Sequence, residues 1–231
     1  MTLARTPRRM GLALLSSVAA AIAAHAADTE PSQTPALRAA YAIRDGGGYE
    51  WKNSTGTPHE IIHDGQVVLA AQPHGTYCCG YTFAVAMDLC RQRSLLAGKS
   101  YREVKRFQKD WYGATEEARE KTCAYAVERL GVGREVARIA DAQPGDFMQI
   151  WRINKSGHAV VLLELLRKHE AIVGIRYRSS QQLTDGVGDR TEYFADAPGQ
   201  EGKLDRRRVY IARLNLEAGS STDASRAPTG D

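Results

Sequence analysis

Two hydrophobic patterns divide the chain between residues 37 and 216. In the first half, apolar residues recur at helical spacing in residues 78–90, 100–113 and 115–133. In the second half, four segments are rich in β-branched and aliphatic residues and are separated by turn residues, which is typical of strands. These segments are residues 146–153, 158–166, 171–179 and 206–216. The order predicts an α+β fold in which N-terminal helices pack on a C-terminal antiparallel β-sheet.

Local signals place the ends of several elements. Ser100 is a candidate N-cap for the second helix, Thr115 for the third, and Gly131 a candidate stop for the third. The first helix is apolar on most faces, so we expect it to be buried inside the fold. Residues 46–58 are expected to form a loop, and residues 60–71 a hairpin about Asp64-Gly65.

The two ends of the chain differ from the middle. A basic start, an apolar run and a small-residue cleavage signature ending at Ala26 predict a signal peptide over residues 1–26 and export to the periplasm or medium. Residues 27–36 are expected to be a flexible leader, 37–216 the folded domain and 217–231 a disordered tail. No other apolar run is long enough to span a membrane, so we expect no integral membrane segment after processing.

Charge adds little to this picture. The formal net charge of +4 falls to +1 without the signal peptide, because that segment holds three arginines and no acidic residue. The remaining basic residues are scattered, apart from residues 206–208, so we expect no nucleic-acid partner. We expect the processed chain to act as a monomer.

Four cysteines carry the candidate chemistry. Cys78 and Cys79 stand where the first helix should begin, and a helix N-terminus favours a thiolate. Their side chains point in directions roughly 100° apart, so only one of them is expected to be a nucleophile. Cys90 and Cys123 lie on separate predicted helices, and a disulfide between them would leave the site untouched.

His158 is the candidate base. It is a polar residue at the head of an apolar strand, directly after a turn. If residues 167–170 form the next turn, His158 faces Ser179 within a residue or two. Ser179, Ser180 and Gln181 are therefore all candidates to orient its imidazole ring.

The chain resembles the NlpC-type cell-wall peptidases of the papain-like superfamily over residues 72–182. The resemblance rests on YCCGYTF (77–83), on the Pro144-Gly145-Asp146 turn before a strand, and on His158 opening the next strand. It implies a papain-like fold and a cysteine peptidase or amidase with Cys78 as nucleophile and His158 as base. It also implies peptide bonds of peptidoglycan as substrate, with no metal or cofactor. Tyr77 departs from the family, which has an aspartate there.

The wider superfamily carries a glutamine six residues before the nucleophile as an oxyanion donor. Gln72 stands six residues before Cys78, and the resemblance gives it that role. The bacteriocin-processing peptidases show a different pattern, Asp-Cys-Gly, on which Cys79 would be the nucleophile. The choice between Cys78 and Cys79 stays open here.

Two other interpretations of the chain remain. Residues 59–63, HEIIH, match a zinc-peptidase motif, but nearby glycines and a proline leave little room for the helix that it needs. The chain could also be a non-catalytic exported binding domain stapled by disulfides. Residues 185–189, DGVGD, are expected to be a plain loop rather than a calcium site.

Overall fold

A seven-stranded sheet and a set of helices form the part of the molecule that a computed structural model describes, residues 34–52 and 55–216. The expected signal peptide, residues 27–33 of the leader and the tail lie outside these residues. The described helices are α1 (Pro35–Ala42), α2 (Cys78–Gln92), α3 (Tyr101–Trp111) and α4 (Cys123–Leu130), with the 3₁₀ turns η1 (Ile139–Asp141) and η2 (Gln182–Thr184).

The described strands, in chain order, are β1 (Gly46–Gly47), β2 (Ile61–His63), β3 (Gln66–Leu69), β4 (Gly133–Glu135), β5 (Phe147–Arg152), β6 (Gly157–Lys168), β7 (Ala171–Gln181), β8 (Gly186–Tyr193) and β9 (Leu204–Leu214). The large sheet has the order β1-β8-β7-β6-β5-β9-β4, and each of its neighbouring strands pairs antiparallel. Strands β2 and β3 form a separate hairpin about Asp64-Gly65, as expected. The α+β class is confirmed.

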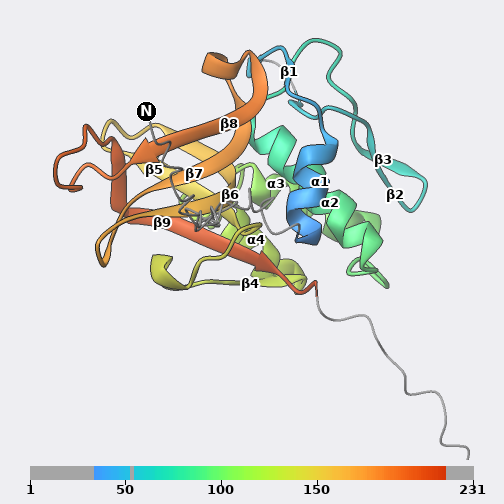
Figure 1. Cartoon of the computed structure of the whole chain (residues 1–231). Helices are drawn as coiled ribbons and strands as arrows, with labels where there is room; N and C mark the ends of the chain where they lie inside the picture. The colour runs from blue at the N-terminus through green and yellow to red at the C-terminus, as the bar shows by residue number, and fades with distance from the viewer. Residues whose placement is uncertain (1–33, 53–54, 217–231) are drawn as a thin grey trace, which may run out of the picture. The chain divides into compact units, whose positions relative to one another are not determined.

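Both faces of the sheet are buried. Phe147, Val161 and Ala212 pack with the helices, whereas their neighbours along the strands belong to a second apolar cluster. Successive side chains of a strand point to opposite faces of the sheet. Because both faces are buried, both sets of side chains must be apolar, and this explains the nearly continuous apolar runs in the sequence. Figure 1 shows α1 and α2 together beside the sheet, and contacts join α2 to β6 and β7.

Helix α2 is buried on most sides, as its composition predicts. Residues from Gly80 to Met87 are all buried, together with Leu89 and Cys90. The expected N-cap of α3 is also confirmed, because Ser100 and Glu103 form a reciprocal capping box. No helix in the described ranges is both long and apolar enough to cross a bilayer.

The expected start of the third helix at Thr115 is wrong. Helix α4 begins only at Cys123, after Thr122, and residues 115–122 form turns. The Thr115 hydroxyl donates to the Asp110 carboxylate at 2.8 Å instead of capping a helix. Gly131 does end α4, with a left-handed φ of 77° that glycine adopts at low cost.

The sequence-based prediction missed helix α1 and strands β1, β4 and β8, and β1 lies within residues 46–58, which were expected to be loop. Residues 185–189, expected as a loop, lead into and begin strand β8, which pairs with β7 along its length. Helix α1 begins at Pro35, so Pro35 and Ala36, the last two residues of the expected leader, are helical. Thr34 caps this helix through its hydroxyl, and proline suits the first helical position.

Candidate active site

Cys78 lies at the first position of α2. Its predecessor Tyr77 is extended and gives the helix no side-chain cap, and no acidic residue lies in the first turn. The first N–H groups of a helix lack partners within the helix and carry partial positive charge. The local sequence therefore places both adjacent thiols where a thiolate is stabilised.

A close backbone contact fixes this end of the helix. Gly80 lies so near Gly56 that an added Cβ would be 2.1 Å from the Gly56 carbonyl carbon. Gly56 has a φ of 67°, and its carbonyl accepts from the Tyr77 N–H at 3.3 Å. Only glycine at position 80 permits this approach, which holds the loop around residue 56 against the start of α2.

His158 and Gln181 are joined by a side-chain hydrogen bond. His158 Nε2 lies 3.0 Å from Gln181 Oε1, and both residues are buried. The Gln181 amide nitrogen donates to the Thr184 hydroxyl and to the Gly188 carbonyl, so its oxygen faces the imidazole. Nε2 therefore carries the hydrogen, and Nδ1 is left with its lone pair.

This contact selects Gln181 from the three residues that could orient His158. The Ser179 hydroxyl instead donates to the Ala159 carbonyl at 2.6 Å, and the Ser180 hydroxyl accepts from Thr76 at 2.8 Å. The β6–β7 turn is centred one residue later than expected, since Lys168 pairs with Ala171, and this moves the partner of His158 by two residues. The ring of His158 therefore meets the side chain of Gln181 rather than that of Ser179.

The pKa values of the two thiols are shifted in opposite directions. A hydrogen bond from the Cys79 thiol lowers the pKa of Cys78 well below its ordinary value, and His158 and the Ala159 N–H act in the same direction, against burial. The bond to Cys78, and then burial, raise the pKa of Cys79. The sulfur atoms lie 3.9 Å apart. These directions favour Cys78 over Cys79 as the thiolate, in agreement with the spacing argument for Cys78.

A charged group lies behind the histidine. The Tyr177 ring contacts the His158 ring edge-on, with centroids 5.5 Å apart, and its hydroxyl donates to Glu192. Arg152 holds Glu192 with two hydrogen bonds of 2.7 and 2.5 Å. Burial raises the pKa of Glu192, but the hydrogen bonds from Arg152 and Tyr177 outweigh it and keep the pKa low. Glu192 is thus a fixed negative charge near the imidazole, a feature that the sequence did not indicate.

Tyr49 is a second site residue that sequence reasoning missed. A bridge to Thr76 holds its backbone beside the segment leading into α2. Burial raises the pKa of its hydroxyl, and the charges of Cys78 and Cys79 raise it further, which places Tyr49 close to both thiols. It comes from the stretch expected as loop, and no motif marks it.

Gln72 is not brought to the thiol by any described contact. Its backbone N–H donates to the Thr57 carbonyl at 2.9 Å, and within the described residues its side chain makes no hydrogen bond. The N–H groups at the start of α2 are the donors that lie next to Cys78. The expected oxyanion role of Gln72 stays a prediction.

The HEIIH segment does not have the geometry of a zinc-peptidase helix. Residues 59 and 60 are irregular, and Ile61–His63 is strand β2. His59 faces Asp88 at 3.4 Å, and His63 Nε2 lies 2.6 Å from the Lys99 carbonyl. In the part of the chain that the structure describes, no three His, Cys, Asp or Glu side chains are grouped as metal ligands.

The remaining cysteines are buried and do not pair. All four cysteines of the chain lie in the described ranges, and all are free thiols. Burial raises the pKa of Cys90 and of Cys123 to about 12. These two residues behave as small apolar side chains, and the disulfide between them that the sequence left open is not formed.

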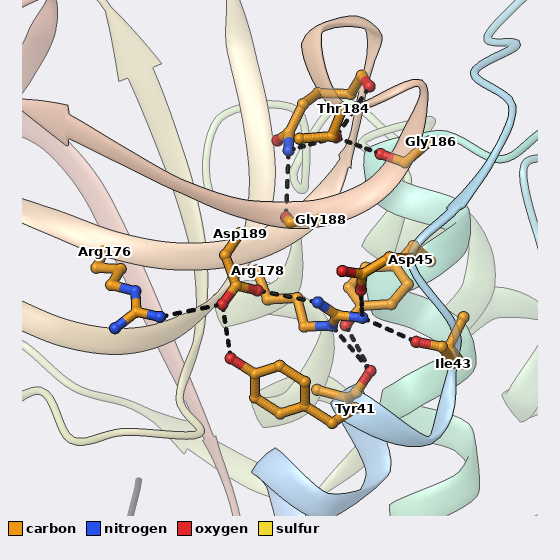
Figure 2. Close-up of polar contacts among 12 residues, drawn as sticks. Tyr41, Ile43, Asp45, Arg176, Arg178, Thr184, Gly186, Gly188 and Asp189 are labelled. Carbon is orange, nitrogen blue, oxygen red and sulfur yellow. Dashed lines mark hydrogen bonds and ion pairs between the residues drawn. The ribbon is translucent and has the colours of Figure 1, made fainter. Parts of the chain in front are cut away.

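A buried arginine anchors the strand that carries Gln181. Figure 2 shows Arg178 between Asp189 of β8 and the segment after α1. Its guanidinium donates to Asp189 at 2.9 Å, to Asp45 at 2.5 Å and to the Ile43 carbonyl at 2.9 Å. The carbonyl of Gly188, next to Asp189, accepts from the Gln181 amide. Strand β8 thus links the arginine cluster to the residue that orients His158.

Comparison with known proteins gives the chain no relative: no protein-family model, no curated protein and no solved structure matches it.

Proposed function

We propose that the chain is a cysteine hydrolase of papain-like type that cleaves amide or peptide bonds. The observation that carries the proposal is the His158–Gln181 hydrogen bond of 3.0 Å beside a thiol whose pKa is lowered at a helix N-terminus. A nucleophile, a base within reach and a group that orients the base are the parts that such chemistry needs. The resemblance of residues 72–182 to NlpC-type peptidases points to the same residues.

In the proposed reaction, the Cys78 thiolate attacks the carbonyl carbon of the substrate. The first N–H groups of α2 donate to the oxyanion that forms, and protonated His158 gives its proton to the leaving amine. A water molecule, deprotonated by His158, then hydrolyses the thioester and frees the acid. Gln181 keeps Nε2 protonated, so that Nδ1 exchanges the proton, and Glu192 stabilises the imidazolium through space.

The proposed substrate is a peptide bond in peptidoglycan. The expected export of the chain and the resemblance both support this class. Glu192 also lines an open cavity of about 410 Å³ together with Ser156 and Leu183. Ser156 precedes His158 by two residues, and Leu183 follows Gln181 by two and is 77% exposed. We propose this cavity as a place for a substrate side group.

The test compares purified wild-type protein with Cys78→Ala on purified peptidoglycan, with new amine ends and released fragments read by mass spectrometry. We expect complete loss of hydrolysis in the variant, with unchanged circular dichroism. Full activity in Cys78→Ala with loss in Cys79→Ala would move the nucleophile by one residue. Activity that survives both changes but is lost to a chelator would instead support a zinc enzyme.

A second measurement does not depend on the choice of substrate. Iodoacetamide at mildly acidic pH alkylates thiolates, and we expect it to label Cys78 while sparing Cys90 and Cys123. No labelling at Cys78 would contradict the proposed nucleophile.

A further inference from the structure

Amide hydrolysis needs one thiol, but two adjacent thiols lie on the first turn of α2. Cys78 and Cys79 are both partly exposed free thiols whose sulfur atoms lie 3.9 Å apart. In contrast, Cys90 and Cys123 are 0% and 1% exposed. An oxidant that reaches this surface meets a thiolate with a second thiol in contact with it.

We propose that Cys78 and Cys79 form a site of reversible oxidation, in which a peroxide oxidises Cys78 and Cys79 closes a disulfide with it. The covalent step rests on the geometry of the pair alone. Its consequence, reversible loss of hydrolysis, rests on the function proposed above, since the disulfide would consume the nucleophile.

The reaction balances with peroxide as the sole oxidant. The Cys78 thiolate attacks one peroxide oxygen, the O–O bond breaks, and Cys78 becomes a sulfenic acid while water or an alcohol leaves after taking a proton. The Cys79 thiolate then attacks the Cys78 sulfur, an S–S bond forms, and the hydroxyl leaves as water with one proton. Two thiols lose two electrons to one peroxide, and a dithiol reductant returns them.

Three features of the fold favour the second step. The sulfur atoms need to approach from 3.9 Å to about 2.0 Å, which side-chain rotation and a twist of the linking peptide can supply. The N–H groups of both residues have no acceptor within the helix, so a twist there breaks no helical bond made by these donors. The hydrogen bond to the Cys78 thiolate keeps Cys79 protonated. This bond is lost once Cys78 is a neutral sulfenic acid, so Cys79 can then ionise and attack.

The same geometry makes the product easy to reduce. Neighbouring Cα atoms are about 3.8 Å apart, closer than the usual range of about 4.4–6.8 Å for a disulfide. A disulfide closed at this distance is strained, and strained exposed disulfides are the readily reduced ones. The pair therefore protects Cys78 from further oxidation without removing it permanently.

The test treats the purified full chain with one equivalent of hydrogen peroxide, blocks free thiols with N-ethylmaleimide and maps the peptides by mass spectrometry. We expect the peptide that holds both residues to lose two hydrogen atoms and to take up no maleimide. Iodoacetamide labelling of Cys78 should be lost and then fully restored by dithiothreitol. Hydrolysis, measured in parallel, should follow the labelling.

Two variants make the result specific. Wild type and variants are therefore also treated with excess peroxide. In Cys79→Ser the resolving thiol is gone, so a second peroxide should take Cys78 from sulfenic to sulfinic acid, and dithiothreitol should restore little of that variant's own initial labelling. Cys90→Ala, a buried change elsewhere on the same helix, should behave as the wild type. Equal recovery in Cys79→Ser and wild type, or a disulfide from Cys79 to Cys123, would overturn the proposal. A vicinal disulfide in a protein without hydrolase activity would leave this proposal standing and reject the proposed function.

Discussion

At the scale of single residues, the candidate site depends on the orientation of the Gln181 side-chain amide. Gln181 has its nitrogen occupied by Thr184 and Gly188, and this leaves its oxygen for His158. A neutral amide orients the imidazole but adds no charge. Glu192, held by Arg152 at a distance from the ring, supplies the charge instead. The two tasks that a single carboxylate could perform are divided between two residues.

Replacing Gln181 with Ala should therefore lower kcat/KM by about 10- to 150-fold, because a hydrogen bond to a group that becomes charged is worth about 1.5–3 kcal/mol. The measurement is steady-state hydrolysis with the fold checked by circular dichroism. Ser179→Ala is the matched control on the same strand, because its hydroxyl contacts the Ala159 carbonyl and not the ring. An equal loss in both variants would reject the assignment.

Glu192 predicts how stability depends on pH. Its pKa in the folded protein is lowered from 4.5, so its ion pair stabilises the fold above about pH 4.5 and this contribution is lost as pH falls through the folded-state value. Glu192→Gln should be less stable than wild type in urea denaturation at neutral pH. The gap between them should shrink in acid, and a gap that widens in acid would contradict the ion pair.

At the scale of elements, the predictable parts are those with strong local signals. The Ser100 capping box, the Asp64-Gly65 hairpin and the apolar strands could all be identified from the sequence. The start of α4 could not, because the Thr115 hydroxyl bonds to Asp110 near the end of α3, a side-chain contact that the helical pattern does not reveal. Strand β8 begins with glycines and an aspartate, residues that disfavour strands, and forms because β7 pairs with it.

In the candidate site, too, the residues with a local sequence signal were the predictable ones. Cys78 and His158 are marked by their places at the starts of a helix and a strand. Tyr49 and Glu192 reach the site only through the packing of distant segments, so no local pattern marks them. Choosing among Ser179, Ser180 and Gln181 required the register of β6 and β7, which depends on where the turn falls.

The contact between α2 and the loop around residue 56 gives a prediction at this scale. Gly80→Ala would push a methyl group into the Gly56 backbone, and overpacking of this kind costs about 1–3 kcal/mol. We expect a lower Tm and slower iodoacetamide labelling of Cys78, because the start of α2 must move. Gly65→Ala is the control, since its φ of 69° is strained by a side chain but no atom lies within 4 Å of the added Cβ. It should lower Tm without changing the labelling.

At the scale of the whole described unit, Arg178 joins α1 to the sheet. Its side chain is 2% exposed and bonds to groups from both parts, so its loss leaves buried acceptors unpaired. Arg178→Met should cost about 3–5 kcal/mol, which lowers Tm by roughly 6–20 °C for a chain of this size.

Arg176→Met provides the comparison. Arg176 contacts the same Asp189 at 3.3 Å but its side chain is half exposed, so its loss should cost no more than about 1 kcal/mol. Differential scanning calorimetry of the two variants measures both values. Similar losses in the two would mean that Arg178 is no more than a surface ion pair.

The β6–β7 hairpin carries one extra residue on each strand, Leu163 on β6 and Val173 on β7. The two irregularities offset one another, so the pairing at Val161 with Arg178 is the pairing that an uninterrupted hairpin would have. Losing either residue alone would shift the strand ends by one position and turn Gln181 away from His158. A deletion in one strand of this hairpin therefore keeps His158 opposite Gln181 only when a deletion in the other strand compensates for it.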